Sequence, residues 1–506
     1  MENDIHFTES DGNSFLTNVK DWLRQTFWVE KLTNKTGAIL LLSFSLIFCF
    51  LIVKKGLIIA VLVLGVMIGP GIVYSIVVFP EFGICLLMLM AYLLFFIMKA
   101  GINFPIGTLM DGIQALLVLG FFIRQKTNPD WSVFKGPVSV MILIWISFNL
   151  MQVANPAAES RLAWVYTIRT VAVVMLMYFV FMYQVKTVKM IRVMINIWLI
   201  LATFAALYAY KQEYIGFSDA EEAWLHSDPE IAGLLFIGGH WRKFSIFSDP
   251  VAFSYNMVVA SVLCVGLLTN AKSVGRKVLL TTLIALFLTA MLFSGTRGAY
   301  VLPPVAMALF VILKFSRSVL IAGCIGAVFL IFLIIVPTSN PSIVRFQTAF
   351  KPSDDDSFKV RAANQKRIKP YIWSHPIGGG LGATGAWGQR FAPNSYLASF
   401  PPDSGYVRIA VELGWLGLFI FCLLMFFILR AGINNYFSIQ DPELQTYCLS
   451  MLLIVFVYNV GNYPQEALVQ FPSNIYFYVA VALINITKRI DDKEIELRVR
   501  SNIKHG

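Results

Sequence analysis

The chain has 506 residues, of which 58% are hydrophobic and only 14% are charged, and its mean hydropathy is +0.71. Soluble domains carry about 25% charged residues, so this composition excludes an ordinary soluble domain and predicts an all-α, polytopic integral membrane protein. The formal net charge of +11 fits basic loops at a membrane surface and gives no reason to expect a nucleic-acid partner.

The first 36 residues are polar and contain no short apolar core followed by a small-residue cleavage site, so we expect no cleavable signal. Apolar residues recur there at helical spacing, interspersed with Lys and Arg: Phe15, Leu16, Val19, Trp22, Leu23 and Phe27. This pattern predicts an amphipathic helix that lies on the cytoplasmic leaflet of the membrane.

From Ala38 onward, apolar segments recur at lengths that span a bilayer, and lipid requires such segments to be helical because their backbone groups must be satisfied internally. We predict about 12–14 transmembrane helices. Their expected positions are 38–53, 56–79, 82–98, 106–123, 137–153, 167–184, 193–210, 251–269, 278–293, 298–313, 318–336, 405–429, 444–461 and 470–487.

The distribution of Lys and Arg predicts the orientation of these helices. With both termini in the cytoplasm, the short inner loops hold most of the basic residues, as the positive-inside rule requires. Lys54 and Lys55 fall on the outer side. Either their turn is an exception, or the Pro70-Gly71 pair divides the second segment into a re-entrant pair.

The chain divides into five expected parts. They are a cytoplasmic segment at 1–36, a transmembrane part at 37–336 with an outer loop at 211–250, a large outer loop at 337–404, the last transmembrane helices at 405–487 and a cytoplasmic tail at 488–506. All six cysteines lie inside apolar runs, so we expect no disulfide framework and no zinc site.

The large outer loop contains a basic segment after three acidic residues. Asp354, Asp355 and Asp356 are typical of a helix start, and the helix is expected to run to about Lys369, before Pro370. Its cationic face could be solvated or face lipid headgroups. Alternatively, it could bind a diphosphate or an acidic glycan, because guanidinium groups bind phosphate oxygens in pairs.

A glycine-rich stretch follows this helix in the sequence HPIGGGLG. Gly380, Gly382 and Gly385 match the spacing of a dinucleotide-binding loop, but no strand precedes them and the loop is expected to face away from the cytoplasm. The stretch is therefore interpreted as a turn that allows the large loop to move.

Three polar clusters on the outer face are candidates for chemistry, because ionisable residues at membrane depth usually face a cavity or a partner. They occupy residues 241–250, 294–298 and 394–412. Each has a structural alternative: Arg297 could extend to headgroups, and Asp249 and Asp403 could each cap a helix. Arg408 and Glu412 could form an ion pair within one helix.

At these clusters the sequence resembles the O-antigen ligase and polymerase superfamily of bacterial envelope glycosyltransferases. The resemblance covers roughly residues 242–419 and rests on the order of four motifs. They are RKFSIFSDPVAFS, SGTRGA, the element from Ser357 to Arg361 followed by HPIGGGLG, and SYLASFPPDSGYVRIAVELGWLGLF.

The resemblance implies an inverting, metal-independent glycosyltransferase without a cofactor, in the bacterial inner membrane with its active site on the periplasmic side. The implied partners are an undecaprenyl-diphosphate-linked glycan donor, a glycan or lipid-linked acceptor, the lipid bilayer and other polysaccharide-assembly proteins. By analogy, Arg242, Arg297 and Arg361 would hold the diphosphate and stabilise the leaving group. The implied substrate-binding residues are Arg242, Asp249, Arg361, Arg367, Arg408 and Glu412, and the catalytic residues are Arg297 and Asp403.

The chain departs from the ligase pattern at one position. Ligases of this family usually place a histidine shortly before the next span, whereas this chain has Pro393, Asn394, Ser395 and Tyr396 there. This favours a polymerase-like member, with Asp403 as the general base. A transporter or flippase of lipid-linked glycans is the alternative, although the chain shows no internal repeat and its charges cluster at the outer face.

Overall fold

The computed structural model describes residues 57–99, 106–237, 239–339, 341–350, 356–469 and 471–505, together with Ile39, Leu42, Ser43, Ser45 and Phe50. The segment expected to be amphipathic, at 1–36, lies outside the described residues, as does most of the expected span at 38–53. The chain divides into two compact units, Met1–Tyr74 and Ser75–Gly506. Every candidate site residue lies in the second unit.

The structure confirms an all-α polytopic membrane protein. The helices of its first half are α3 (Leu57–Val78), α4 (Pro80–Lys99), α5 (Ile106–Thr127), η2 (Trp131–Phe134), α6 (Pro137–Met151), η3 (Gln152–Ala154), α7 (Arg161–Ile168), η4 (Arg169–Val173), α8 (Val174–Gln184), α9 (Val188–Tyr214), α10 (Asp219–Leu225) and α11 (Pro229–Leu235). Two short antiparallel strands follow, β1 (Phe236–Ile237) and β2 (His240–Trp241).

The second half of the chain is helical in the same way. Its helices are α12 (Pro250–Leu268), α13 (Val274–Phe293), α14 (Arg297–Tyr300), α15 (Leu302–Leu313), α16 (Arg317–Ile335), α17 (Pro341–Thr348), α18 (Asp356–Ser374), α19 (Gly385–Phe391), α20 (Gly405–Ser438), α21 (Pro442–Gly461) and α22 (Ser473–His505).

Each predicted span from residue 56 onward overlaps one or more of these helices, although α20 and α22 continue beyond the spans expected at 405–429 and 470–487. Among the described residues, ten helices are long and apolar enough to cross a membrane, and the segment Arg297–Leu313 is shorter. The structure excludes one alternative, and it shows one expectation to be wrong. Pro70 lies inside α3, which does not divide into a re-entrant pair. Pro370 lies inside α18, which continues to Ser374 instead of ending near Lys369.

Local sequence signals explain where many of the helices begin. Asp249 and Asp441 cap α12 and α21, and each is followed by a proline at the first helical position, where the missing N–H costs nothing. Thr187, Ser273 and Ser316 cap α9, α13 and α16 by accepting a hydrogen bond from a backbone N–H of the first turn.

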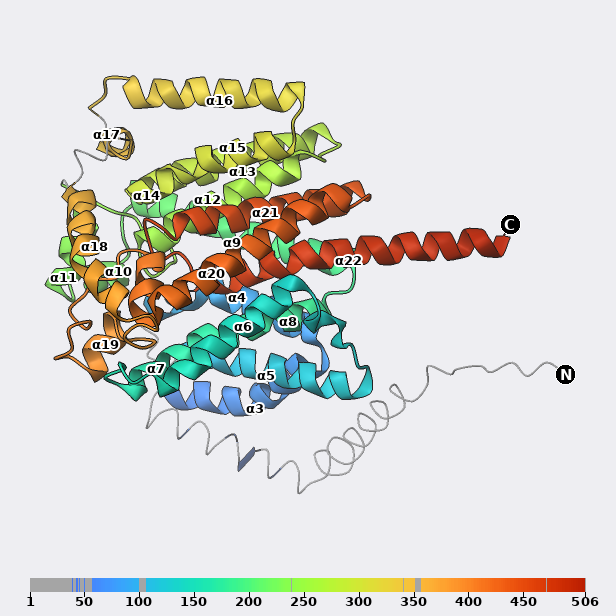
Figure 1. Cartoon of the computed structure of the whole chain (residues 1–506), viewed down its shortest axis with the longest axis horizontal. Coiled ribbons are helices and arrows are strands. Elements are labelled where there is room, and N and C mark those ends of the chain that lie inside the picture. Colours follow the sequence, from blue (N-terminus) through green and yellow to red (C-terminus); the bar gives the residue numbers. More distant parts are fainter. Residues whose placement is uncertain are drawn as a thin grey trace. The chain divides into compact units, whose positions relative to one another are not determined.

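The core of the second unit is built around α12, α21 and α22. Helix α12 packs against α13 and α21, α22 packs against α21 and α8, and α20 packs against α6 and α21. The short helices α10, α11, α18 and α19 gather at the end of the bundle where α20 begins (Figure 1). The two long loops that the sequence assigns to one face therefore meet at one end of the helices.

Candidate functional site

Two arginines hold the SGTRG turn between α13 and α14. Arg242 donates from Nε to the Ser294 carbonyl at 2.9 Å and from Nη2 to Thr296 Oγ1 at 3.0 Å. Arg345, on α17, donates from Nε to the Gly295 carbonyl at 2.6 Å. Burial, followed by the nearby Arg345, lowers the pKa of Arg242 to about 10, so the group remains cationic at neutral pH. These contacts fix the turn that carries Arg297.

The first of two neighbouring cavities is cationic. Arg297, at the start of α14, and Arg361, on α18, both line a cavity of about 480 Å³, and none of the described residues that line it is acidic. The other lining residues are Gly298, Val301, Leu302, Ala349, Phe358, Tyr406, Asn459, Val460, Tyr463 and Pro464. The volume lies in the usual range of ligand sites. We call this space the cationic cavity.

The second cavity is acidic and has a volume of about 210 Å³. Asp249, Asp403 and Glu466 line it, and none of the described residues that line it is basic. The remaining lining residues are Val251, Ala252, Tyr255, Pro402, Gln465, Ala467 and Ser473. Within the described parts of the chain, no three His, Cys, Asp or Glu side chains are grouped so as to hold a metal ion.

The two cavities share a wall. Tyr255 lines the acidic cavity, and its hydroxyl donates to the Gly461 carbonyl at 2.9 Å. Gly298 lines the cationic cavity, and a Cβ at Gly298 would lie 3.4 Å from both the Tyr255 hydroxyl and Pro464. The consecutive residues Pro464 and Gln465 line the cationic and the acidic cavity, respectively. The two cavities are therefore adjacent, and the groups of one ligand or of two reacting ligands that occupied them would be separated only by this wall.

The two predicted aspartates differ in how they are bound. Asp249 caps α12, since its Oδ1 accepts from Val251 N at 2.8 Å and from Ala252 N at 3.0 Å. Asp403 does not cap α20, because Ser404 occupies that position and accepts from the first turn. The Asp403 carboxylate accepts no hydrogen bond from any described residue, so its oxygens remain available to a ligand in the acidic cavity.

Arg408 and Glu412 form a buried ion-pair network on α20. Arg408 Nε lies 3.1 Å from Glu412 Oε1, and its Nη1 lies 2.9 Å from Glu466 Oε2. The Glu412 carboxylate also accepts from Gly382 N at 2.9 Å, from Thr384 N at 3.3 Å and from the Thr384 hydroxyl. The pair between Arg408 and Glu412 is the structural alternative that their spacing predicted. Through Glu466 and Gly382 the network also joins the large loop to the α21–α22 loop.

The glycine-rich turn is fixed to α20. Gly379 N and Gly380 N donate to the carbonyls of Val411 and Glu412 at 3.0 and 2.9 Å. Gly414 has a φ of 71° and breaks the helical geometry of α20 at this contact. A Cβ at Gly378 would lie 2.4 Å from the backbone of Glu412 and Gly414. The turn is thus an anchor of the large loop, whereas the sequence was interpreted as allowing movement there.

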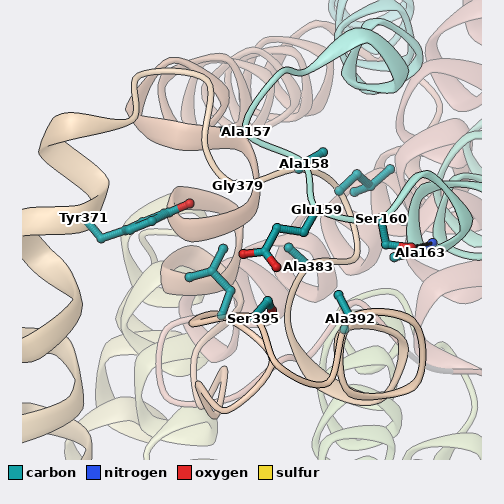
Figure 2. Close-up of a pocket in the computed structure, with 14 residues that line it drawn as sticks. Ala157, Ala158, Glu159, Ser160, Ala163, Tyr371, Gly379, Ala383, Ala392 and Ser395 are labelled. Carbon is teal, nitrogen blue, oxygen red and sulfur yellow. Dashed lines mark hydrogen bonds between the residues drawn. The ribbon is translucent and has the colours of Figure 1, made fainter.

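A much smaller cavity lies beside this turn. Figure 2 shows the Glu159 carboxylate pointing into it, between Tyr371 and Ser395. Its volume is about 20 Å³, which has room for about one water molecule. Burial raises the pKa of Tyr371, and Glu159 adds to the shift. The space is too small for a sugar ring, so we do not place the substrate there.

The structure brings four of the predicted site residues to the two cavities and separates the other four from them. Arg297 and Arg361 meet in the cationic cavity, and Asp249 and Asp403 meet in the acidic cavity. Arg242 lies behind the SGTRG turn, Arg408 and Glu412 line a third cavity of about 260 Å³, and Arg367 is exposed on α18 and lines none of these cavities.

Sequence reasoning missed Arg345 and Glu466. Arg345 lies within the loop expected at 337–404, but only its contact with the SGTRG turn distinguishes it from the other cations there. Glu466 lies in the short loop between the last two expected spans. A lone carboxylate in such a loop was the available signal, since ionisable residues beside membrane spans often face a partner.

Residues 282–422 match the family model described as O-Antigen ligase. The match extends from α13 into α20 and includes Arg297, Arg361 and Asp403. Arg242, Asp249 and Glu466 lie outside it. No curated protein matches the chain.

Proposed function

We propose that this chain, whose residues 282–422 match the O-antigen ligase family model, acts as a member of the O-antigen ligase/polymerase superfamily and joins undecaprenyl-diphosphate-linked glycans at the periplasmic face of the bacterial inner membrane. The observation that carries the proposal is the pair of cavities: two arginines from separate helices line one of them, and an aspartate without a hydrogen-bond partner among the described residues lines the other.

In the proposed reaction an acceptor hydroxyl attacks the anomeric carbon of the donor glycan. A bond forms between the acceptor oxygen and that carbon, and the bond from the carbon to the diphosphate oxygen breaks. The electron pair leaves with the lipid diphosphate, and the hydroxyl proton moves to Asp403. A single displacement of this kind inverts the anomeric configuration.

Arg297 and Arg361 have the chemistry that the leaving group requires. Guanidinium groups bind phosphate oxygens through charge-assisted hydrogen bonds, often in pairs. Fixed cations that face the developing charge stabilise it most where water is scarce. Arg242 and Arg345 act one layer behind, because they hold the backbone of the turn that carries Arg297.

A polymerase remains the favoured activity over a ligase. The stretch from Pro393 to Tyr396, where ligases usually have a histidine, is used here as local structure, because Ser395 Oγ accepts from Ala398 N at 3.0 Å. His375 is also engaged locally, since its ring stacks on Tyr371 and its Nδ1 lies 3.0 Å from the Tyr371 carbonyl. Asp403 is therefore the better candidate for the base.

The test is a comparison of variants in a strain that lacks the chromosomal copy of this protein. Arg297→Ala and Asp403→Asn should each abolish the polymer ladder on a glycan gel while the protein inserts at the wild-type level. Arg367→Ala, which changes an exposed arginine on α18, is the matched control and should retain the ladder. Wild-type ladders from both site variants would contradict the site assignment.

Purified protein distinguishes transfer from transport. In detergent there is no second compartment, so a flippase has nothing to move. We expect the purified wild-type protein to extend lipid-linked glycan isolated from the deletion strain. If it does not, while it restores the ladder in cells, transport of the glycan becomes the better explanation.

A further inference from the structure

Glu466 has an unusual environment for a carboxylate. Its Oε2 is held by Arg408 Nη1 at 2.9 Å. Its Oε1 is buried and has no hydrogen-bond partner among the described residues. A buried acceptor without a partner costs free energy, so its presence in a folded protein requires an explanation, of which a bound ligand or water is one.

The orientation of Glu466 is fixed from two sides. Arg408 is held in turn by Glu412, which is itself bound to the glycine-rich turn. The backbone of the α21–α22 loop, which carries Glu466, is bound to the start of α20, since Gly405 N donates to the carbonyls of Asn462 and Gln465 at 2.9 and 3.3 Å. The free oxygen of Glu466 is therefore preorganised, as a binding group requires.

The negative charge of the acidic cavity determines which part of the substrate can bind there. A diphosphate would be repelled by Asp249, Asp403 and Glu466, and would be attracted to the neighbouring cationic cavity. A sugar hydroxyl, in contrast, donates a hydrogen bond to a carboxylate, and this charge-assisted bond is stronger than one between neutral groups.

The size of the acidic cavity supports the same assignment. Its volume of about 210 Å³ is below the range of roughly 300–1,000 Å³ that is typical for drug-sized ligands. It therefore has room for one sugar ring rather than for an oligosaccharide. Because Tyr255 lies in the wall that the two cavities share, a ring bound in the acidic cavity would lie next to the cationic cavity.

We propose that the acidic cavity is the acceptor subsite, that Glu466 binds a hydroxyl of the acceptor's terminal sugar, and that this sugar is uncharged. The inference rests on the proposed transferase function and deepens it. Glu466 binds the ring, while Asp403 accepts the proton of the attacking hydroxyl. A terminal uronic acid would be disfavoured, because its carboxylate would enter a space that already holds three acidic side chains.

The first test separates acceptor binding from chemistry. The purified protein is assayed with lipid-linked glycan from the deletion strain as donor, and with the fluorescently labelled oligosaccharide released from that lipid as acceptor. Glu466→Gln should raise the acceptor KM at least tenfold and change kcat and the donor KM less than threefold. Glu159→Gln, a change of an exposed carboxylate outside both cavities, is the matched control and should change neither.

The outcomes distinguish the two proposals. An absence of transfer by the wild-type protein would count against the transferase function itself. Active wild-type protein together with an unchanged acceptor KM in Glu466→Gln would overturn only the acceptor subsite. A loss of kcat at constant acceptor KM would also overturn it, because Glu466 would then act on the chemical step.

A second test uses the wild-type protein and does not depend on the folding of a variant. Oxidation of the terminal sugar's primary hydroxyl gives an acceptor that ends in a uronic acid, and methylation gives its uncharged ester. The acid should have a KM at least tenfold higher than the ester. Equal KM values for the acid and the ester would show that the cavity does not select by charge and would overturn the proposal.

Discussion

Replacement of Glu412 by glutamine tests whether the buried network on α20 holds the large loop in place. Glu412 accepts from Gly382 N, Thr384 N and the Thr384 hydroxyl, and it pairs with Arg408. Glutamine keeps the shape but removes the charge, and its NH₂ group would face at least one of these donors. Of its two acidic partners among the described residues, Arg408 would then keep Glu466.

The magnitude follows from these contacts. A hydrogen bond to a charged group contributes about 1.5–3 kcal/mol, and removal of one partner of a buried ion pair costs about 3–5 kcal/mol. The contributions share the same carboxylate and do not add. We therefore expect Glu412→Gln to lower the free energy of unfolding by about 3–5 kcal/mol.

The assay is equilibrium unfolding of purified protein in mixed micelles, with Glu159→Gln as an isosteric control at an exposed position. Limited proteolysis provides a second measurement, and cleavage near the glycine-rich turn should become faster in Glu412→Gln. A loss of less than about 1 kcal/mol, with an unchanged cleavage pattern, would refute the view that Glu412 anchors the loop.

Three further predictions concern the site. Ser404→Ala should cost about 0.5–1 kcal/mol of stability, because Ser404 caps α20 through a long bond of 3.5 Å, whereas Asp403→Asn should leave unfolding unchanged in the same assay. Arg361→Ala should lower kcat about 100-fold, whereas Arg367→Ala on the same helix should lower it less than twofold, as measured by glycan transfer in detergent. Burial raises the pKa of Glu466 above its usual value of 4.5 despite its guanidinium partner. Protonation of this carboxylate on acidification should therefore raise the acceptor KM already above pH 4.5. Glu466→Gln should remove this pH dependence.

The sequence predicted the membrane helices well because lipid leaves little choice. A long apolar run must become a helix, and Pro or Asp at its start marks the first turn, as at Asp249 and Pro250. The predicted end of α18 was wrong because Pro370 was interpreted as a residue that terminates the helix. Proline is most disruptive where its ring meets the preceding turn, and α18 accommodates it and continues to Ser374.

The site was predicted only in part, because the sequence shows which residues are charged but not which of them meet. Arg361 and Arg367 belong to one helix and have the same chemistry, yet only Arg361 lines the cationic cavity. Asp249 and Asp403 both precede helices, yet only Asp249 caps one. Such differences depend on tertiary contacts, which no local pattern contains.

The separation of charge between the two cavities has a consequence for the proposed reaction. During the displacement, negative charge builds up on the leaving diphosphate, and the attacking oxygen becomes more positive until its proton is lost. In the proposed reaction, Arg297 and Arg361 lie on the side where the negative charge develops, and Asp403 lies across the shared wall on the side of the attacking oxygen. The field of these fixed charges is therefore directed along the movement of charge and favours the transition state over the bound substrates. Replacement of either Arg297 or Asp403 by a neutral residue should therefore lower kcat more than it changes the binding of the donor lipid.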